Sequence, residues 1–147
     1  MTVHLIKLCV GVDKPSELAE WQAERLKRLA RAGKRPEHCH RTLQTPRRRA
    51  ELLDGGSLYW VIKGFVLVRQ RVLDLRADVR EDGTSCCGIV LDTELVATRP
   101  HPRRAFQGWR YLEAADAPPD AKGFHGEADE MPGAMREELR ALRLIDW

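Results

Sequence analysis

The chain has 147 residues, of which 43% are hydrophobic and 32% charged, and its formal net charge is +3. This length suits one domain that buries its core without disulfides or metals, and the composition is typical of an ordered chain. No apolar run reaches the roughly 20 residues that a membrane-spanning helix requires, and the N-terminus lacks a signal-peptide pattern, so we expect a cytoplasmic protein that does not contact membranes.

The charge is unevenly distributed. Residues 1–110 carry 21 Lys and Arg against 13 Asp and Glu, whereas residues 111–147 carry 4 against 9. A basic body followed by an acidic segment is typical of proteins that bind polyanions, although the acidic segment can equally dock on the basic body of its own chain. The cysteines show no disulfide spacing, which predicts reduced thiols at Cys9, Cys39, Cys86 and Cys87.

The N-terminal part predicts a strand followed by a helix. Residues 3–10 are apolar on both faces, as in an internal strand. Residues 15–32 have helical periodicity, and Gly33 is a natural stop for that helix. Trp21, at the margin of its apolar face, is expected in the core.

A basic loop and a short helix are predicted next. Residues 34–46 form the loop, and Thr45-Pro46 opens the helix. Gly55 and Gly56 end the helix, since glycine is the usual residue after a helix C-terminus.

From Ser57 the sequence favours strands. Residues 57–68 are apolar on both faces, with Gly64 marking a bend or bulge, and residues 73–79 alternate between apolar and charged. A turn at 81–84 leads to a returning strand at 86–91, and a further strand is predicted at 106–112.

The C-terminal part predicts an acidic loop at about 113–133 and a helix at about 133–144. We therefore expect one α+β domain over residues 1–147, with a mixed or antiparallel sheet curled toward a barrel and two to three helices. Oligomeric state does not follow from these patterns.

Three stretches carry a family resemblance: His4-Leu5-Ile6-Lys7-Leu8-Cys9-Val10-Gly11, the run from Arg49 to Gly64 containing Asp54-Gly55-Gly56-Ser57-Leu58-Tyr59-Trp60, and Phe106-Gln107-Gly108-Trp109-Arg110-Tyr111-Leu112. They resemble a bacterial family known as the domain of unknown function 1489, over nearly the whole length. The family has no established activity, so the resemblance implies a bacterial protein and no reaction. The order of elements is also similar to PUA-like barrels, which include accessory domains of RNA-modifying enzymes; such a fold analogy leaves function open.

Catalytic and metal-binding signatures are missing from the sequence. No phosphate-binding loop, dinucleotide fingerprint, nucleophile elbow or zinc-protease motif is present, and Gly55-Gly56 follows a helix, where the dipole disfavours an anion. His38-Cys39-His40 has no second spaced pair with which to hold zinc. We predict no metal and no cofactor.

The leading functional prediction is a basic, aromatic-lined cleft that binds RNA or a nucleotide-like anion. Arginine binds phosphate with two parallel hydrogen bonds, aromatic rings stack on unpaired bases, and glutamines read base edges. The predicted ligand-binding residues are His40, Arg41, Arg48, Lys63, Arg69, Gln70, Arg103, Arg104, Gln107, Trp109 and Arg110.

Structural roles compete with this prediction, because Trp60 is expected in the core and Arg69 can pair with Asp54 or Asp92 instead. Two other functions stay open. One is a small enzyme that uses His40 or Cys39 as acid, base or nucleophile on an anionic substrate, since a basic loop favours a thiolate. The other is a protein-interaction module in which the acidic segment at 113–133 controls access to the basic face.

Overall fold

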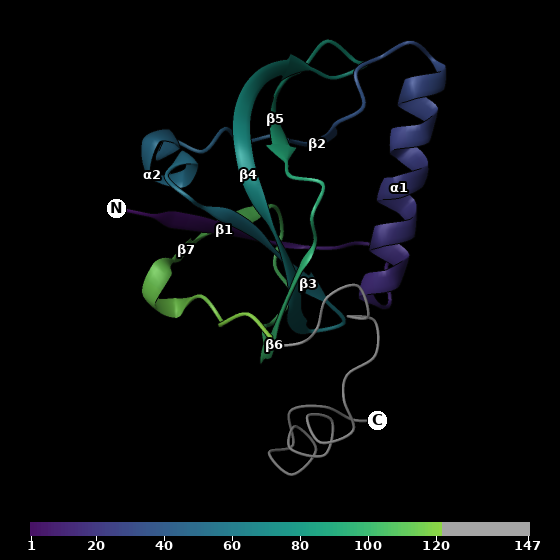
Figure 1. The fold of residues 1–147 in the computed structure, drawn as a ribbon. Helices are drawn as coiled ribbons and strands as arrows, with labels where there is room; N and C mark the ends of the chain where they lie inside the picture. The colour runs from purple at the N-terminus through teal and green to yellow at the C-terminus, as the bar shows by residue number, and fades with distance from the viewer. Residues whose placement is uncertain (122–147) are drawn as a thin grey trace.

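A computed structural model describes residues 1–121 of the chain; the predicted helix at 133–144 and most of the acidic loop lie outside these residues. The described part is an α+β fold with a seven-stranded sheet and two α-helices (Figure 1). Its elements are β1 (Val3–Leu8), α1 (Pro15–Arg31), β2 (His38–Thr42), α2 (Arg49–Leu53), β3 (Ser57–Ile62), β4 (Phe65–Val79), β5 (Ser85–Leu91), β6 (Val96–Pro102), β7 (Trp109–Glu113) and a 3₁₀ turn at Ala114–Asp116.

The sheet is mixed, which is one of the two arrangements that the sequence left open. Its strand order is β2-β5-β4-β3-β1-β7, with β6 paired to β4. β1 and β3 are parallel, because a crossover through α1, β2 and α2 separates them, and the other pairs are antiparallel. The end strands β2 and β7 do not pair with each other, so the sheet is open and the PUA-like barrel is not supported.

Side chains nevertheless join the two ends of the curled sheet. The Trp109 indole Nε1–H on β7 donates to the Gln44 carbonyl at 2.8 Å, just after β2. The Tyr111 hydroxyl accepts the backbone N–H groups of Arg47 and Arg48 at 2.7 and 3.0 Å. We call the gap between β2 and β7 the seam; it is bounded by residues 41–44 on one side and 107–109 on the other.

The sheet buries apolar side chains on both faces. The larger cluster includes Val3, Leu5, Leu58 and Trp60, and the smaller one includes Ile6 with its neighbours on the opposite face. Because successive side chains of a strand alternate between faces, the next residue of β1 after Val3 and Leu5 on the larger-cluster face is a lysine, Lys7. This cation lies where a third apolar residue is expected.

The double glycine ends α2, as predicted, whereas the helix begins at Arg49 and not at Thr45-Pro46. Gly55 has φ +82°, and a Cβ on Gly56 would lie 2.3 Å from the backbone oxygens of both Leu52 and Val3. Glycine is needed at position 56 because α2 and β1 approach the backbone too closely for any side chain. The close approach allows β3 to start beside β1, which it pairs in parallel.

Three local predictions are wrong. The predicted basic loop contains β2, in which histidines occupy positions where apolar residues would have indicated a strand. Lys63 and Gly64 form a two-residue turn with φ +49° and +82° between β3 and β4, which the sequence suggested to be one bent strand. Trp21 is 51% exposed instead of buried.

α1 lies along one side of the sheet (Figure 1). Of its 17 residues, Pro15, Leu18 and Gln22 are buried. Neither described helix has the length and apolar character needed to cross a bilayer.

Candidate functional site

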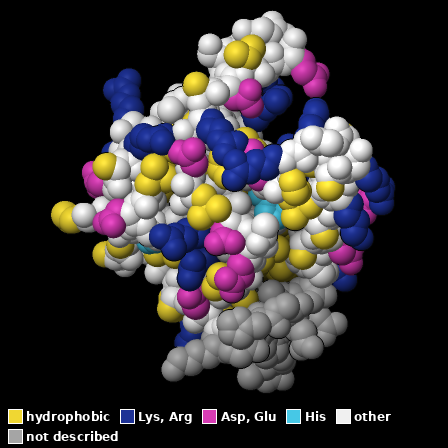
Figure 2. Space-filling model, turned by 45° about the horizontal axis from the view of Figure 1, so that its top comes forward, with side chains coloured by type: hydrophobic (Ala, Val, Ile, Leu, Met, Phe, Trp, Pro, Cys, Tyr) yellow, Lys and Arg dark blue, Asp and Glu magenta, His cyan; other side chains and the backbone are white. Residues whose placement is uncertain are grey.

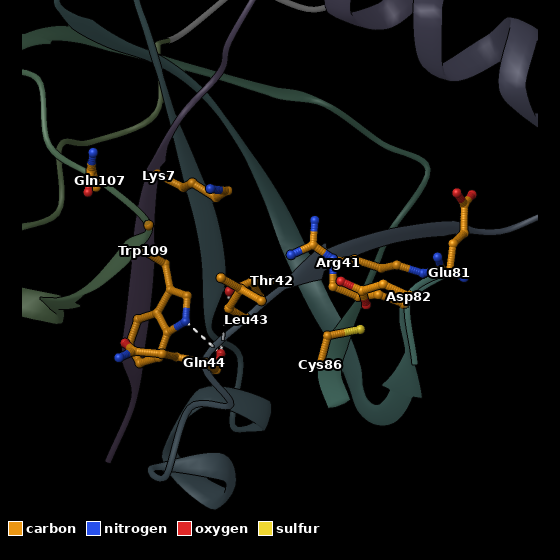
Figure 3. A pocket seen from close by; sticks show the side chains of 12 residues that line it. Lys7, Arg41, Thr42, Leu43, Gln44, Glu81, Asp82, Cys86, Gln107 and Trp109 are labelled. Carbon is orange, nitrogen blue, oxygen red and sulfur yellow. Dashed lines mark hydrogen bonds between the residues drawn. The ribbon is translucent and has the colours of Figure 1, made fainter. Parts of the chain in front are cut away.

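An open cavity of about 880 Å³ occupies the seam (Figure 3). We call it the seam cavity. It is lined by the side of β1 at Lys7, by the end of β2 and the residues after it, by the β4–β5 turn, and by the start of β7. The residues are Lys7, Arg41, Thr42, Leu43, Gln44, Arg80, Glu81, Asp82, Cys86, Gln107, Gly108 and Trp109.

Lys7 stands between two tryptophans on the same face of the sheet. In the strand registers it is opposite Trp109 on β7 and Trp60 on β3. Directly opposite residues share a face and lie close together. Lys7 makes no ion pair with any residue of the described chain, and Figure 3 shows its side chain extending between Trp109 and Arg41. Sequence reasoning missed Lys7, although a cation in an inward-facing apolar row was a signal.

Two arginines add positive charge on the other side of the cavity. Arg41 on β2 donates through Nε to Asp78 at 2.9 Å, and Arg80 has no ion pair within residues 1–121. Glu81 and Asp82 line the same end, and Asp82 accepts the Thr84 backbone N–H at 2.9 Å. Hydrogen bonding by the Thr84 side chain, and next by this backbone N–H, lowers the pKa of Asp82, so its carboxylate stays ionised. The cavity thus carries three cations and two carboxylates.

Trp109 forms the opposite wall. Its indole is fixed by the bond to Gln44 and by an edge-to-face contact with Tyr111, with ring centroids 4.8 Å apart. A ring held in this way loses little conformational freedom when a ligand stacks on it. Gln107, two residues before Trp109, lies at the rim of the cavity (Figure 3).

Gln70 lies in the core and not in a ligand site. Its side chain is 0% exposed. Its amide oxygen accepts from Gln22 Nε2 and from Trp60 Nε1, each at 2.9 Å, and its amide nitrogen donates to Gln22 Oε1 and to the Asp92 carbonyl. The prediction that Gln70 reads a base edge is therefore wrong, because its hydrogen-bonding groups are buried and already satisfied. Trp60 is buried, as expected.

Arg48 and Arg69 bind carboxylates from the start of the acidic segment. Arg69 makes a two-pronged pair with Asp120, at 2.8 Å for each bond, instead of pairing with Asp54 or Asp92. Arg48 pairs with Glu51 and Glu113 and lies over the Tyr111 ring. In its described part the acidic segment neutralises the basic body of its own chain.

The other predicted cations lie away from the seam cavity. Lys63 is in the β3–β4 turn, with its ammonium 3.7 Å from Asp13, and the backbone N–H of Arg103 donates to the Gly64 carbonyl beside that turn. Arg104 follows Arg103 after the end of β6. Arg110 lies over Phe106, on the face opposite to its neighbour Trp109.

The predicted basic side chains of the described residues therefore lie at several separate places. Figure 2 shows a face on which Lys and Arg side chains gather near the centre, with Asp and Glu side chains set among them. Of the eleven predicted residues, the seam cavity brings together Arg41, Gln107 and Trp109.

His40 and Cys39 have properties opposite to those of a reactive pair. Burial, followed by Lys7 and Arg25, lowers the pKa of His40 to about 4, so the imidazole is neutral. Burial and then the nearby Glu37 carboxylate raise the pKa of Cys39, which disfavours the thiolate that the basic loop suggested. Adjacent strand residues face opposite sides, which separates Cys39 from both neighbouring histidines. Among residues 1–121 no group of three or more His, Cys, Asp or Glu side chains is arranged to hold a metal ion.

A family model described as "Protein of unknown function (DUF1489)" matches residues 5–145, nearly the whole chain. The chain belongs to this family. No curated protein and no solved structure gives a significant match.

Proposed function

We propose that the seam cavity binds a nucleotide-like anion, and that single-stranded RNA is the macromolecule that presents it. The observation that carries the proposal is the placement of Lys7 directly opposite Trp109, with Arg41 across the same open cavity. A cation beside an aromatic ring matches a phosphate beside an unpaired base.

Each wall of the cavity has a distinct role in this proposal. Trp109 offers a fixed surface on which a base stacks, and Gln107, which lines the same cavity, would contact a base edge. A phosphate fits between Lys7 and Arg41, because Glu81 and Asp82 make the far end of the cavity unfavourable for negative charge. A bound phosphate would supply Lys7 with the anionic partner it lacks within the described chain.

The proposal is tested by the affinity of fluorescein-labelled oligouridylate, measured by anisotropy over a series of salt concentrations. Lys7→Met and Arg41→Gln should each weaken binding and reduce the slope of log affinity against log salt by about one, as expected for a lost phosphate contact. Trp109→Leu should weaken binding by about 5-fold to 160-fold, which corresponds to the loss of one stacked base.

Arg110→Gln is the matched control, because it removes a cation one residue away from Trp109 on the opposite face. Its affinity should equal that of the unmodified protein. Arg41→Gln removes both the cation and its ion pair with Asp78. Asp78→Asn breaks the same ion pair but leaves the Arg41 guanidinium in place, so comparing the two variants separates the two effects. Salt-independent binding, or an Arg110→Gln effect as large as that of Arg41→Gln, would overturn the proposal.

A further inference from the structure

A second cavity, of about 460 Å³, lies between α1 and strands β1 and β2. We call it the helix cavity. Its apolar walls include Trp60, which is buried, and two exposed side chains, Val10 at 87% and Trp21 at 51% exposure. Its volume falls in the range of small-molecule sites, which are mostly apolar with a few polar groups.

Two imidazole rings of β2 line the helix cavity, and one nitrogen of each has no hydrogen-bond partner within residues 1–121. His38 and His40 are two residues apart on one strand and therefore share a face. His38 Nδ1 and His40 Nε2 are buried, and neither atom has a partner within residues 1–121. The His38 side chain is 5% exposed. An unpaired buried polar atom costs about 1–3 kcal/mol, so such atoms in native proteins call for an explanation.

The polar end of the helix cavity is positively charged. Lys7 and Arg25 both line it, and neither forms an ion pair within the described chain. The two cations act on His40 from β1 and α1, and Trp60 on β3 contacts its ring edge-on with centroids 5.2 Å apart. Among the described residues, Glu17 is the one acidic residue that lines this cavity, and its carboxylate accepts the Asp13 backbone N–H at 3.2 Å.

We propose that the helix cavity binds an aromatic monocarboxylic acid. The carboxylate accepts hydrogen bonds from His40 Nε2 and His38 Nδ1, each in the tautomer that places its proton there, and its charge is balanced by Arg25 and Lys7. The aromatic body packs against Trp21 and Trp60. A single carboxylate suits this site better than a phosphate ester, because most of the wall beyond the two cations is apolar.

The helix cavity shares Lys7 with the seam cavity and is otherwise lined by different residues. Its test therefore uses Arg25 and leaves Lys7 unchanged. Arg25 lies over the Trp21 ring at 5.6 Å from its centroid, within the cavity wall. Arg28, one turn further along α1, is exposed and does not line the cavity, which makes Arg28→Gln the matched control.

The probe is 1-naphthoate, with the neutral 1-naphthalenemethanol as its counterpart, and binding is followed through the histidine ring signals in ¹H–¹³C NMR spectra. We expect saturable shifts of the His38 and His40 signals with a Kd of about 1 mM or tighter. Arg25→Gln should weaken naphthoate binding at least tenfold, Arg28→Gln should leave it unchanged, and the neutral alcohol should bind at least tenfold more weakly.

Equal affinities for the two variants, equal affinities for the acid and the alcohol, or the absence of histidine shifts would each overturn the proposal. Thermal unfolding of both variants shows whether they are folded, and His40→Phe supplies a second, uncharged change at the same wall that should also weaken naphthoate binding. Oligouridylate affinity of Arg25→Gln should equal that of the unmodified protein, so a failure here is distinguishable from a failure of the seam-cavity proposal.

Discussion

Replacing Gln70 with leucine tests whether this residue belongs to the core or to a ligand site. The substitution keeps the size of the side chain but removes both amide groups. Four hydrogen bonds are lost, two with Gln22 and one each with Trp60 and Asp92. The Gln22 and Trp60 groups left behind are buried, so water does not readily replace Gln70 as their partner.

The number of hydrogen-bonding groups left without a partner determines how much the free energy of unfolding falls. A lost neutral hydrogen bond costs about 1 kcal/mol on average, and a stranded buried partner more, so Gln70→Leu should lower the free energy of unfolding by roughly 3–5 kcal/mol. Gln22→Leu should cost about 1–2 kcal/mol, because both amide atoms of Gln70 then keep another partner, Trp60 Nε1–H or the Asp92 carbonyl. The double variant should cost less than the sum, since the two residues share two of the bonds.

Urea unfolding followed by circular dichroism measures these differences through the midpoint and slope of each transition. Gln70→Leu should be the less stable variant while, where folded, it binds oligouridylate as the unmodified protein does. A Gln70→Leu variant as stable as Gln22→Leu, or one that is folded but fails to bind oligouridylate, would refute the assignment of Gln70 to the core.

Three further predictions concern stability. Lys63→Asn should raise the free energy of unfolding, measured by urea titration, by about 0.5 kcal/mol. Asparagine tolerates the positive φ at this turn, and the exposed contact with Asp13 contributes little. A loss of stability would contradict this prediction. Gly56→Ala should lower the free energy of unfolding by at least about 2 kcal/mol, because the new Cβ meets two backbone oxygens. Gly83→Ala has open space around its Cβ and should lower it by about 1 kcal/mol because of the positive φ. Similar losses for the two variants would be inconsistent with the close approach at Gly56. His40 has a pKa of about 4 when folded and an ordinary value of 6.5, so the unfolded chain binds its proton first. The contribution of His40 to stability should therefore be level above about pH 7 and fall as the pH drops from 6.5 to 4. Urea midpoints at about pH 7, 5.5 and 4.5 should fall less steeply for His40→Gln than for the unmodified protein, and equal slopes would argue against a neutral His40.

Local sequence patterns predicted the elements whose signals are local. The apolar runs gave β1 and β3, the turn residues at 81–84 gave the β4–β5 hairpin, and Gly55-Gly56 marked the end of α2. β2 was missed because His38 and His40 fill its inward positions, where an apolar pattern would have revealed a strand.

The roles of polar residues depend on partners distant in the sequence. Gln70 is a core residue because Gln22 meets it from α1, 48 positions earlier. Arg69 and Arg48 are occupied by Asp120 and Glu113, and neither pairing follows from charge counts. Arg41, Gln107 and Trp109 meet because the two end strands of a curled sheet approach each other, and Lys7 joins them through the register of β1 with β7.

The most direct test of ligand binding at the seam is to follow all backbone amides and the tryptophan indole N–H groups by ¹H–¹⁵N NMR during a titration with oligouridylate. We predict the largest shifts at the Trp109 indole and at the backbone of Lys7 and Arg41, with Lys63 and Arg110 unaffected. Shifts centred on the β3–β4 turn around Lys63, or no shifts at low salt, would contradict RNA binding at the seam cavity.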